Sequence, residues 1–288
     1  MSIISDISNM PIGVFDSGFG GLTVLKQLLK ILPNENYIYL GDNINIPYGD
    51  KTKEEIEKLT FKMADFLINQ KCKMLVIACN TISACSYSIL KDKYQIPIIE
   101  VISNGVKDAL NNTKNNNIYI IGTEFTIQSN AYKNEINKYN KANKNNNKIN
   151  KNNKVKITQL ACRKLCPMIE NDWSSYDNRL EVLNSYLENI DENSDTLILA
   201  CTHYTHILDD IKNLLQNNIK NNVKNIIDPA YYTAASVKQY LEKNNLLNNN
   251  NNNIKIYTTE NIQKANRIID IFLPKEIYNN YAIKHLNL

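Results

Sequence analysis

The stretch "IGVFDSGFGGLTVLKQLLKIL", residues 12–32, decides the fold class. Its first residues form an apolar run typical of a buried strand, and a glycine-rich turn follows at 18–21. Leucines then recur at helical spacing from Leu22 to Leu32. A buried strand that leads through a tight turn into an amphipathic helix is typical of a parallel sheet with helices on its faces.

The alternation of strand and helix continues along the rest of the chain. Further apolar strands are predicted at 36–42, 74–80, 96–102, 117–123, 154–162, 195–201, 223–230 and 253–259. Helices are predicted at 53–69, 82–94, 126–139, 176–190, 204–216, 232–244 and 261–273. The pattern therefore indicates the α/β fold class, with two similar halves that each contain a parallel sheet flanked by helices.

Composition places the chain among globular proteins. Its 288 residues are 43% hydrophobic, which is enough for one large core or two of ordinary size. An apolar stretch of about 18 residues, which a transmembrane helix needs, does not occur in the sequence. The first residues lack the basic start and long apolar middle of a signal peptide. We therefore expect a cytoplasmic protein with no membrane partner.

The net charge of +4 comes from one segment. Residues 138–156 hold seven lysines and no acidic residue, in a tract with little aromatic content. Such a tract is typical of a solvated loop, so we do not expect a specific nucleic-acid surface. The asparagine-rich stretches 140–153 and 244–253 bury too little apolar area to form structure and are predicted to be insertions in loops.

The six cysteines are expected to be thiols, because disulfides are rare in the cytosol. No C-x-x-C motif occurs, and only three histidines are present, so we predict no metal site and no thioredoxin-like redox site. Cys162 and Cys166 form a C-x3-C spacing, which is a weak indication.

Two of the cysteines share a pattern. "LVIACNTISA" (75–84) and "LILACTHYTH" (197–206) both end an apolar strand in Ala-Cys, just before a predicted helix. A helix N-terminus lowers the pKa of a thiol and attracts carboxylates, so Cys79 and Cys201 are candidates for bases beside an anionic substrate. The alternative is that each cysteine is a small buried hydrophobic residue. Polar residues after both of them favour the chemical role.

Ligands of parallel sheets bind beyond the carboxyl ends of the strands. A dense polar set is expected there around the two thiols. It comprises Asp16, Ser17, Tyr48, Gly49, Asn80, Thr81, Gly122, Thr123, Thr126, Cys162, Thr202 and His203.

Five segments together resemble the glutamate racemases, in the same order and at similar separations. They are "IGVFDSGFGGLTVL", "YLGDNINIPYG", "LVIACNTISA", "IGTEFTIQSNAY" and "LILACTHY", and the resemblance runs from about residue 11 to 240. It implies a cofactor-independent racemase that inverts glutamate with two bases on opposite faces of the α-carbon. The product, D-glutamate, implies a role in supplying peptidoglycan synthesis, and family members are often homodimers.

The resemblance also implies roles for the site residues. Cys79 would deprotonate D-glutamate with help from Asp16, and Cys201 would deprotonate L-glutamate with help from His203 and Glu170. The residues expected to hold the ammonium and carboxylate groups of the substrate are Asp16, Ser17, Tyr48, Gly49, Asn80, Thr81, Thr202 and His203, with Thr123 and Thr126 as weaker candidates.

The same resemblance suggests how the chain is divided. We expect an active site in the cleft between two pseudo-symmetric domains, with the chain crossing near 102–105 and returning near 207–210. The expected first domain is discontinuous, 11–103 plus 208–288, and the second is 104–207 with the Asn/Lys-rich insertion at about 140–153.

The chain departs from the family pattern at several positions. Thr205 stands where proline is usual, Ala200 where glycine is common, and Asp228 is followed by Pro229. Arg163 and Cys166 interrupt the segment before Glu170, where the family often has Cys-Pro-x-x-Val-Pro. None of these changes removes a proposed acid or base.

Three other functions are alternatives to this one. An aspartate racemase or related amino-acid racemase would use the same scaffold and the same two cysteines. A catalytically inactive binding or regulatory homologue is disfavoured by the presence of both cysteines. A thiol redox protein lacks C-x-x-C and explains neither Asp16 nor Tyr48.

Overall fold

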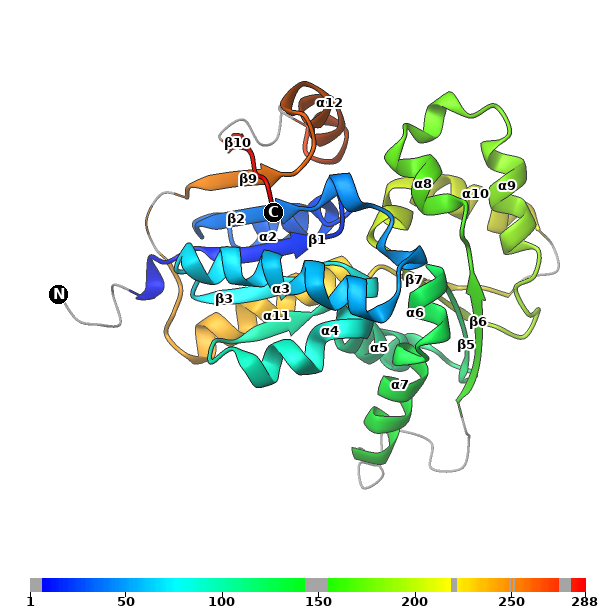
Figure 1. Cartoon of the computed structure of the whole chain (residues 1–288). Coiled ribbons are helices and arrows are strands. Elements are labelled where there is room, and N and C mark those ends of the chain that lie inside the picture. Colours follow the sequence, from blue (N-terminus) through cyan, green and yellow to red (C-terminus); the bar gives the residue numbers. More distant parts are fainter. Residues whose placement is uncertain (1–6, 143–154, 219–221, 249, 251, 275–280) are drawn as a thin grey trace.

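The computed structural model contains two parallel sheets with helices packed around them (Figure 1). It describes residues 7–142, 155–218, 222–248, 250, 252–274 and 281–288. Most of the predicted Asn/Lys-rich insertion at 140–153 lies outside these residues. None of the helices that the structure describes combines the length and apolar character needed to cross a bilayer.

The first sheet has six strands in the order β10-β9-β2-β1-β3-β4. Their bounds are Ile12–Asp16 for β1, Tyr37–Gly41 for β2, Met74–Ile77 for β3, Ile98–Glu100 for β4, Ile254–Thr258 for β9 and Tyr281–His285 for β10. Every neighbouring pair is parallel. Successive residues of β1 face opposite sides, so that Val14 and Phe15 enter two different apolar clusters.

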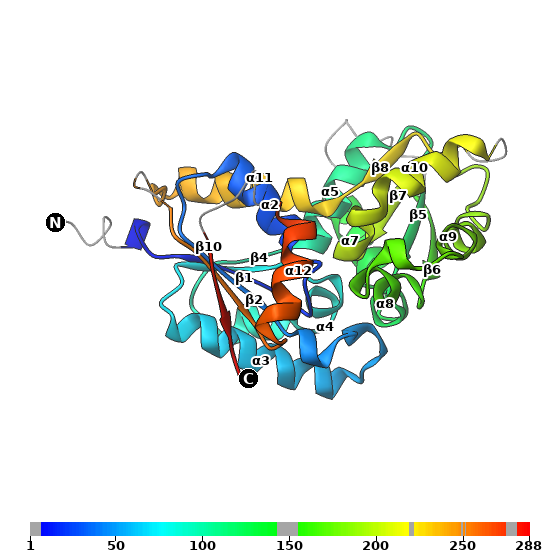
Figure 2. The same ribbon diagram turned by 90° about the horizontal axis from the view of Figure 1, so that it is seen from above.

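Helices cover both faces of this sheet (Figure 2). Helices α2 (Leu22–Ile31) and α11 (Pro229–Lys243) pack together on one face, and α3 (Lys53–Asn69) and α4 (Asn80–Lys93) pack together on the other. Helix α12 (Ile262–Phe272) lies between β9 and β10 in the chain and contacts α2.

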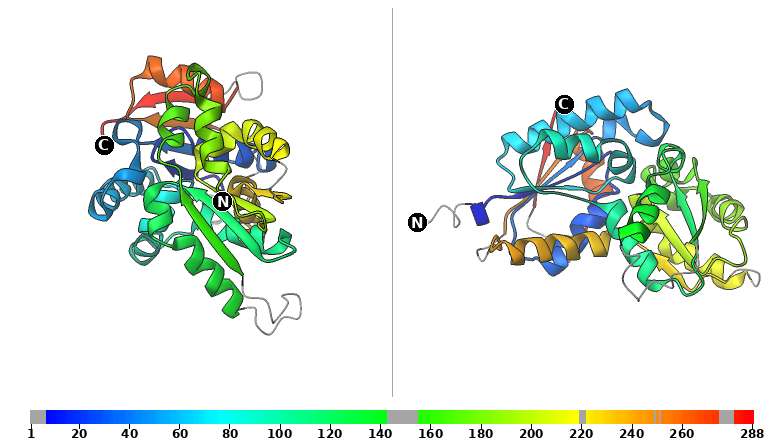
Figure 3. Two further views of the ribbon diagram at one scale, coloured as in Figure 1. Left: turned by 90° about the vertical axis from the view of Figure 1, so that its right-hand side faces the viewer. Right: turned by 90° about the horizontal axis from the view of Figure 1, so that it is seen from below.

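The second sheet has four parallel strands in the order β6-β5-β7-β8 (Figure 3). They span Asn117–Gly122 (β5), Lys156–Ala161 (β6), Thr196–Ala200 (β7) and Asn225–Ile227 (β8). The helices around it are α5 (Val101–Asn112), α6 (Glu124–Gln128), α7 (Ala131–Ala142), α8 (Leu165–Glu170), α9 (Arg179–Leu187) and α10 (Leu208–Asn217). The order β6-β5-β7-β8 repeats the order β2-β1-β3-β4, which confirms the predicted pseudo-symmetry.

The expected return of the chain at 207–210 is wrong. Strand β8 pairs with β7, and α10 packs against α9, so residues 208–227 belong to the second domain and not to the first. The backbone carbonyl of Asp195 accepts hydrogen bonds from the N–H groups of Lys224 and Asn225 and fixes β8 in this sheet. The return is made at α11, which packs beside α5, the helix that makes the outward crossing.

Several predicted elements differ in extent. The strand predicted at 96–102 ends at Glu100, whose carboxylate accepts hydrogen bonds from the N–H groups of Ile102 and Ser103 and thereby starts α5. The helix predicted at 126–139 is broken at Asn130, which has a φ of 55°. Strand β10 and the short helix α8 were not predicted at all.

Candidate functional site

Cys79 and Cys201 occupy equivalent positions in the two domains. Cys79 follows β3 and is the N-cap of α4, and Cys201 follows β7 and is the N-cap of the 3₁₀ helix η4 (Thr202–Ile207). In the two sheets β3 and β7 hold the same place in the strand order. Both thiols are buried, and each cysteine is only 5% exposed.

Hydrogen bonds join residues near the strand ends of one sheet to residues near the strand ends of the other. The carboxyl ends of the two sheets therefore face each other. Thr202 Oγ1 donates to Asp16 Oδ2 at 3.2 Å. Glu170 Oε1 accepts from the backbone N–H of Phe19 at 3.4 Å and from Asn43 Nδ2 at 3.0 Å. The predicted polar residues of the two domains are thus brought to one boundary.

Two glycines make this close approach feasible. A Cβ atom on Gly20 would lie 2.5 Å from Thr202 Oγ1 and 2.6 Å from His203 Nδ1. A Cβ atom on Gly49 would lie 2.6 Å from Cβ of Thr123. Any larger residue at either position would force these side chains, or the domain that carries them, to shift.

Cys201 lies beside a histidine and a carboxylate. Its sulfur is 3.7 Å from Nδ1 of His203, while Nε2 of His203 is 2.5 Å from Oε2 of Glu170. All three residues are buried. Glu170 therefore orients the imidazole, and the imidazole contacts the thiol.

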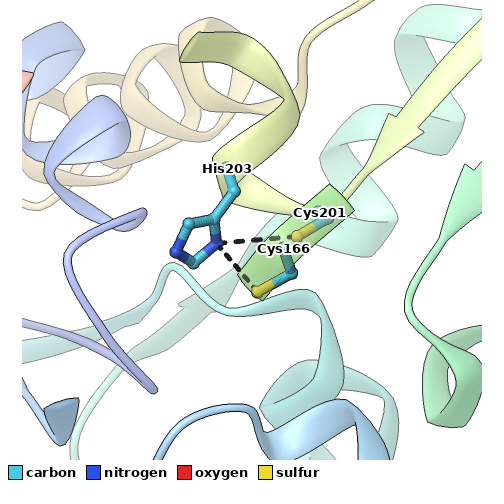
Figure 4. Close-up of side chains that lie close together, drawn as sticks. All are labelled: Cys166, Cys201 and His203. Carbon is cyan, nitrogen blue, oxygen red and sulfur yellow. Dashed lines mark hydrogen bonds between the residues drawn. The ribbon is translucent and has the colours of Figure 1, made fainter. Parts of the chain in front are cut away.

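Cys166 of α8 also belongs to this group, as Figure 4 shows. Its sulfur is 3.6 Å from Nδ1 of His203, so the ring nitrogen faces both sulfurs. From the sequence, Cys166 is a departure from the family pattern and one half of a C-x3-C spacing, and it is not among the predicted site residues. The signal that pointed to it, the C-x3-C spacing with Cys162, is misleading, because Cys162 is not among the donors that gather here.

The environment of Cys201 favours its thiolate form. Burial alone would raise the pKa of Cys201, but hydrogen bonds from Cys166 and His203 and the charge on His203 lower it below its ordinary value. Burial also disfavours the charged form of His203 and so acts to lower its pKa. The charge of Glu170 and the contact with Cys201 nevertheless raise the pKa of His203 well above its ordinary value. The pair therefore resembles a thiolate beside an imidazolium.

The environment of Cys79 has the opposite effect. Burial and the charge of Asp16 raise the pKa of Cys79 to about 12, despite hydrogen bonds from the Ile82 N–H and from Ser17. The Ser17 hydroxyl lies 3.5 Å from its sulfur. The expectation that a helix N-terminus lowers the pKa of both thiols is therefore wrong for Cys79, because loss of water outweighs the nearby N–H groups.

Asp16 lies at the end of β1, buried completely. Burial raises its pKa to about 6, although the charge on His203 and a 2.8 Å hydrogen bond from the Gly18 N–H act in the opposite direction. A carboxyl group with this pKa changes protonation near neutral pH, which suits a group that moves protons.

The predicted threonines form a cluster of hydroxyl groups across the boundary. Thr81 Oγ1 lies 2.9 Å from Thr123 Oγ1, which in turn lies 2.9 Å from Thr126 Oγ1. Nearby, Tyr132 donates its hydroxyl hydrogen to Asn80 Oδ1 at 2.6 Å. These bonds link α4 of the first domain to α6 and α7 of the second.

Tyr48 is placed differently from the other predicted residues. Its hydroxyl donates to Asp42 Oδ2 at 2.6 Å, within the first domain. Asp42 also accepts from Thr259 at 3.0 Å, so the phenol is part of a buried network that supports the loop 42–50. Neither Asp42 nor Asn43, which binds Glu170, was singled out from the sequence.

Known proteins match this chain in sequence over most of its length. Residues 12–237 match the family model described as Asp/Glu/Hydantoin racemase. A glutamate racemase of Fusobacterium nucleatum is 44% identical over 269 residues, which cover 92% of this chain and 95% of that relative.

Solved structures are similar over nearly the whole chain. A glutamate racemase of Bacillus anthracis has a TM-score of 0.85 at 32% identity, covering 98% of both chains. A glutamate racemase of Francisella tularensis in complex with D-glutamate has a TM-score of 0.82 at 37% identity, covering 98% of this chain and 97% of that one. The matched length, the identity and the shared architecture together establish that this chain belongs to the Asp/Glu/Hydantoin racemase family.

Proposed function

We propose that this chain is a glutamate racemase that interconverts L- and D-glutamate without a cofactor, by proton transfer through Cys79 and Cys201. The observation that carries the proposal is the equivalent placement of these two thiols at the facing ends of the two sheets. Inversion at one carbon needs an acid and a base on opposite faces, and a pseudo-symmetric pair of domains supplies one from each side.

The reaction from L-glutamate begins at Cys201. Its thiolate removes the α-proton, so that an S–H bond forms, the Cα–H bond breaks and the electron pair stays on the α-carbon and its carboxylate. The thiol of Cys79 then donates its proton to the other face and gives D-glutamate. The opposite pKa shifts of the two cysteines support this direction, because one begins as thiolate and the other as thiol.

The neighbouring residues have separate roles in this proposal. His203, held by Glu170, stabilises the thiolate of Cys201, and Asp16 exchanges protons on the Cys79 side. The substrate is bound by the polar groups at the strand ends, which are Ser17, the backbone at Tyr48 and Gly49, Asn80, Thr81, Thr123, Thr126 and Thr202. Preorganised N–H and hydroxyl groups of this kind stabilise the negative charge that develops on the carboxylate.

The biological role follows from the product. D-glutamate is a building block of peptidoglycan, so the enzyme supports cell-wall synthesis and cell shape. A cytoplasmic location and a homodimer remain predictions, which cell fractionation and sedimentation analysis test.

The decisive experiment is exchange of the α-proton in heavy water, starting from L-glutamate, with optical rotation followed in parallel. Wild type, Cys79→Ser, Cys201→Ser and the control Cys85→Ser are compared, since Cys85 is a thiol outside the site. We expect inversion with deuterium at Cα for wild type and control, and loss of inversion in both site variants.

Other results would change the assignment. Turnover of L-aspartate in place of L-glutamate would make the chain an aspartate racemase. Absence of exchange with both amino acids would favour the binding homologue. Retained inversion in either site variant would exclude the two-thiol mechanism.

A further inference from the structure

Cys166 has no part in the proposed proton transfers, yet it lies at the centre of the site with its sulfur beside that of Cys201 (Figure 4). We propose that Cys166, Cys201 and His203 form a binding site for one soft divalent cation, with Zn²⁺ as the best match. This inference goes beyond the racemase activity, because a metal has no role in that reaction.

The distances fit a tetrahedral zinc centre. Zinc–sulfur bonds of about 2.3 Å and zinc–nitrogen bonds of about 2.0–2.1 Å at tetrahedral angles separate sulfur from nitrogen by about 3.6 Å. The two sulfurs lie 3.6 Å and 3.7 Å from Nδ1 of His203, and all three donor atoms are within 4.8 Å of one another. An ion placed between them needs little movement of the protein.

Glu170 provides the support that metal-binding histidines usually have. A histidine that ligates a metal through one ring nitrogen commonly donates the other N–H to a carboxylate, which fixes the tautomer and the ring orientation. Here Nε2 of His203 is 2.5 Å from Glu170 Oε2, and Nδ1 faces the sulfurs. The imidazole is thus already presented with its metal-binding nitrogen toward the two thiols.

The chemistry of the donors selects the cation. Two sulfurs and an imidazole favour Zn²⁺ and similar soft ions, whereas Mg²⁺ and Ca²⁺ prefer oxygen ligands. Three protein ligands leave a fourth position for water. Cys166 is 6% exposed and Cys201 5%, so the ion would be bound in a buried position.

Metal binding would inhibit the enzyme, and this consequence rests on the proposed function. A thiolate of Cys201 that is bonded to zinc is a much weaker base toward the α-proton, because the cation withdraws electron density from the sulfur. The inhibition is reversible, because a chelator competes for the ion.

The test is a direct measurement of metal binding by the reduced, chelator-dialysed protein. Zn²⁺ is titrated in competition with a chromophoric chelator, and Co²⁺ is added separately to record thiolate-to-cobalt charge-transfer absorption. Wild type, Cys166→Ser, Cys166→Ala and the control Cys85→Ser are compared. We expect one Zn²⁺ per chain in wild type and control, and at least about 100-fold weaker binding in both Cys166 variants.

The outcomes separate this proposal from the proposed function. Absence of stoichiometric Zn²⁺ binding, or of the cobalt charge-transfer band in wild type, would overturn the metal site even if a variant failed to fold. Equal affinity in wild type and a folded Cys166 variant would also overturn it. A protein that binds Zn²⁺ but does not racemise glutamate would keep the metal site and reject the racemase assignment.

Discussion

Thr202 donates its hydroxyl hydrogen to Oδ2 of Asp16 at 3.2 Å, and this bond joins the residue after Cys201 to the residue that ends β1. Both residues are buried. The carboxylate that we propose to assist Cys79 is therefore held by a direct neighbour of Cys201. This contact connects the two halves of the site, so we expect a change on one side to affect the proposed proton transfer on the other.

The first prediction concerns the pH dependence that Asp16 causes. Because its pKa is about 6, the carboxylate form that accepts a proton is lost as the pH falls through 6. With D-glutamate as substrate, kcat/KM should therefore rise with pH and level off above about 6. Thr202→Val removes a hydrogen bond to the carboxylate and should move this rise in kcat/KM to higher pH, whereas Thr202→Ser should leave the rise at the same pH. If kcat/KM of Asp16→Asn rose over the same pH range, the rise would have to be assigned to another group.

The second prediction concerns His203. Replacing it with glutamine removes the positive charge that lowers the pKa of Cys201, so less thiolate is present at neutral pH. We expect kcat/KM for L-glutamate to fall by about 10²-fold or more, with the optimum shifted to higher pH. His206→Gln is the matched control: His206 lies in the same 3₁₀ helix and also packs against Phe272, whereas it is Nδ1 of His203 that faces the sulfur of Cys201. Equal losses in both variants would contradict a specific role for His203.

The third prediction concerns the contact between the domains at Gly20. In Gly20→Ala the new methyl group would overlap Thr202 and His203, so the two halves of the site cannot close on the substrate. We expect kcat/KM to fall by about 10²-fold while the unfolding midpoint in urea changes little. Gly13→Ala should behave in the opposite way, because its methyl group meets Cys72 and Leu75 in the core of the first domain at 3.0 Å. Full activity in Gly20→Ala would show that the domains need not approach so closely.

The fourth prediction concerns a buried ion pair far from the site. Lys73 Nζ lies 2.6 Å from Glu35 Oε2, with both side chains almost fully buried. Glu35→Ala leaves the ammonium without its counter-charge and should lower the free energy of unfolding in urea by about 3–5 kcal/mol. Glu135→Ala, which breaks an exposed pair with Lys138, should cost less than about 1 kcal/mol. Similar losses for the two variants would mean that burial does not determine the cost.

Much of the fold could be predicted from the sequence because local patterns determine it. The strand, turn and helix at 12–32 form as their apolar spacing indicates, and both Ala-Cys segments end strands at equivalent positions. The sheet that a short strand joins depends on distant hydrogen-bond partners. For this reason β8 was assigned to the wrong domain, although its position in the chain was predicted.

The candidate site shows the same division between local and distant causes. Residue types and strand ends predicted which polar groups gather, from Asp16 to His203. The environment of each group was not predictable, because burial depends on the whole fold. Cys79 and Cys201 have similar local sequences, yet their pKa values shift in opposite directions, since only Cys201 has a buried histidine and a second thiol beside it.

The placement of α5 and α11 has a mechanical consequence. These helices make the two crossings between the sheets and pack side by side, with Ser236 donating a hydrogen bond to Asn104. The two chain connections between the domains thus lie side by side along one edge and form a hinge. Rotation about that edge would separate Gly20 from Thr202 and leave the strand pairing within each sheet intact. Both thiols are almost closed off from water, so for the proposed racemase this rotation is the movement expected to admit the amino acid, and we expect it to limit the rate of turnover.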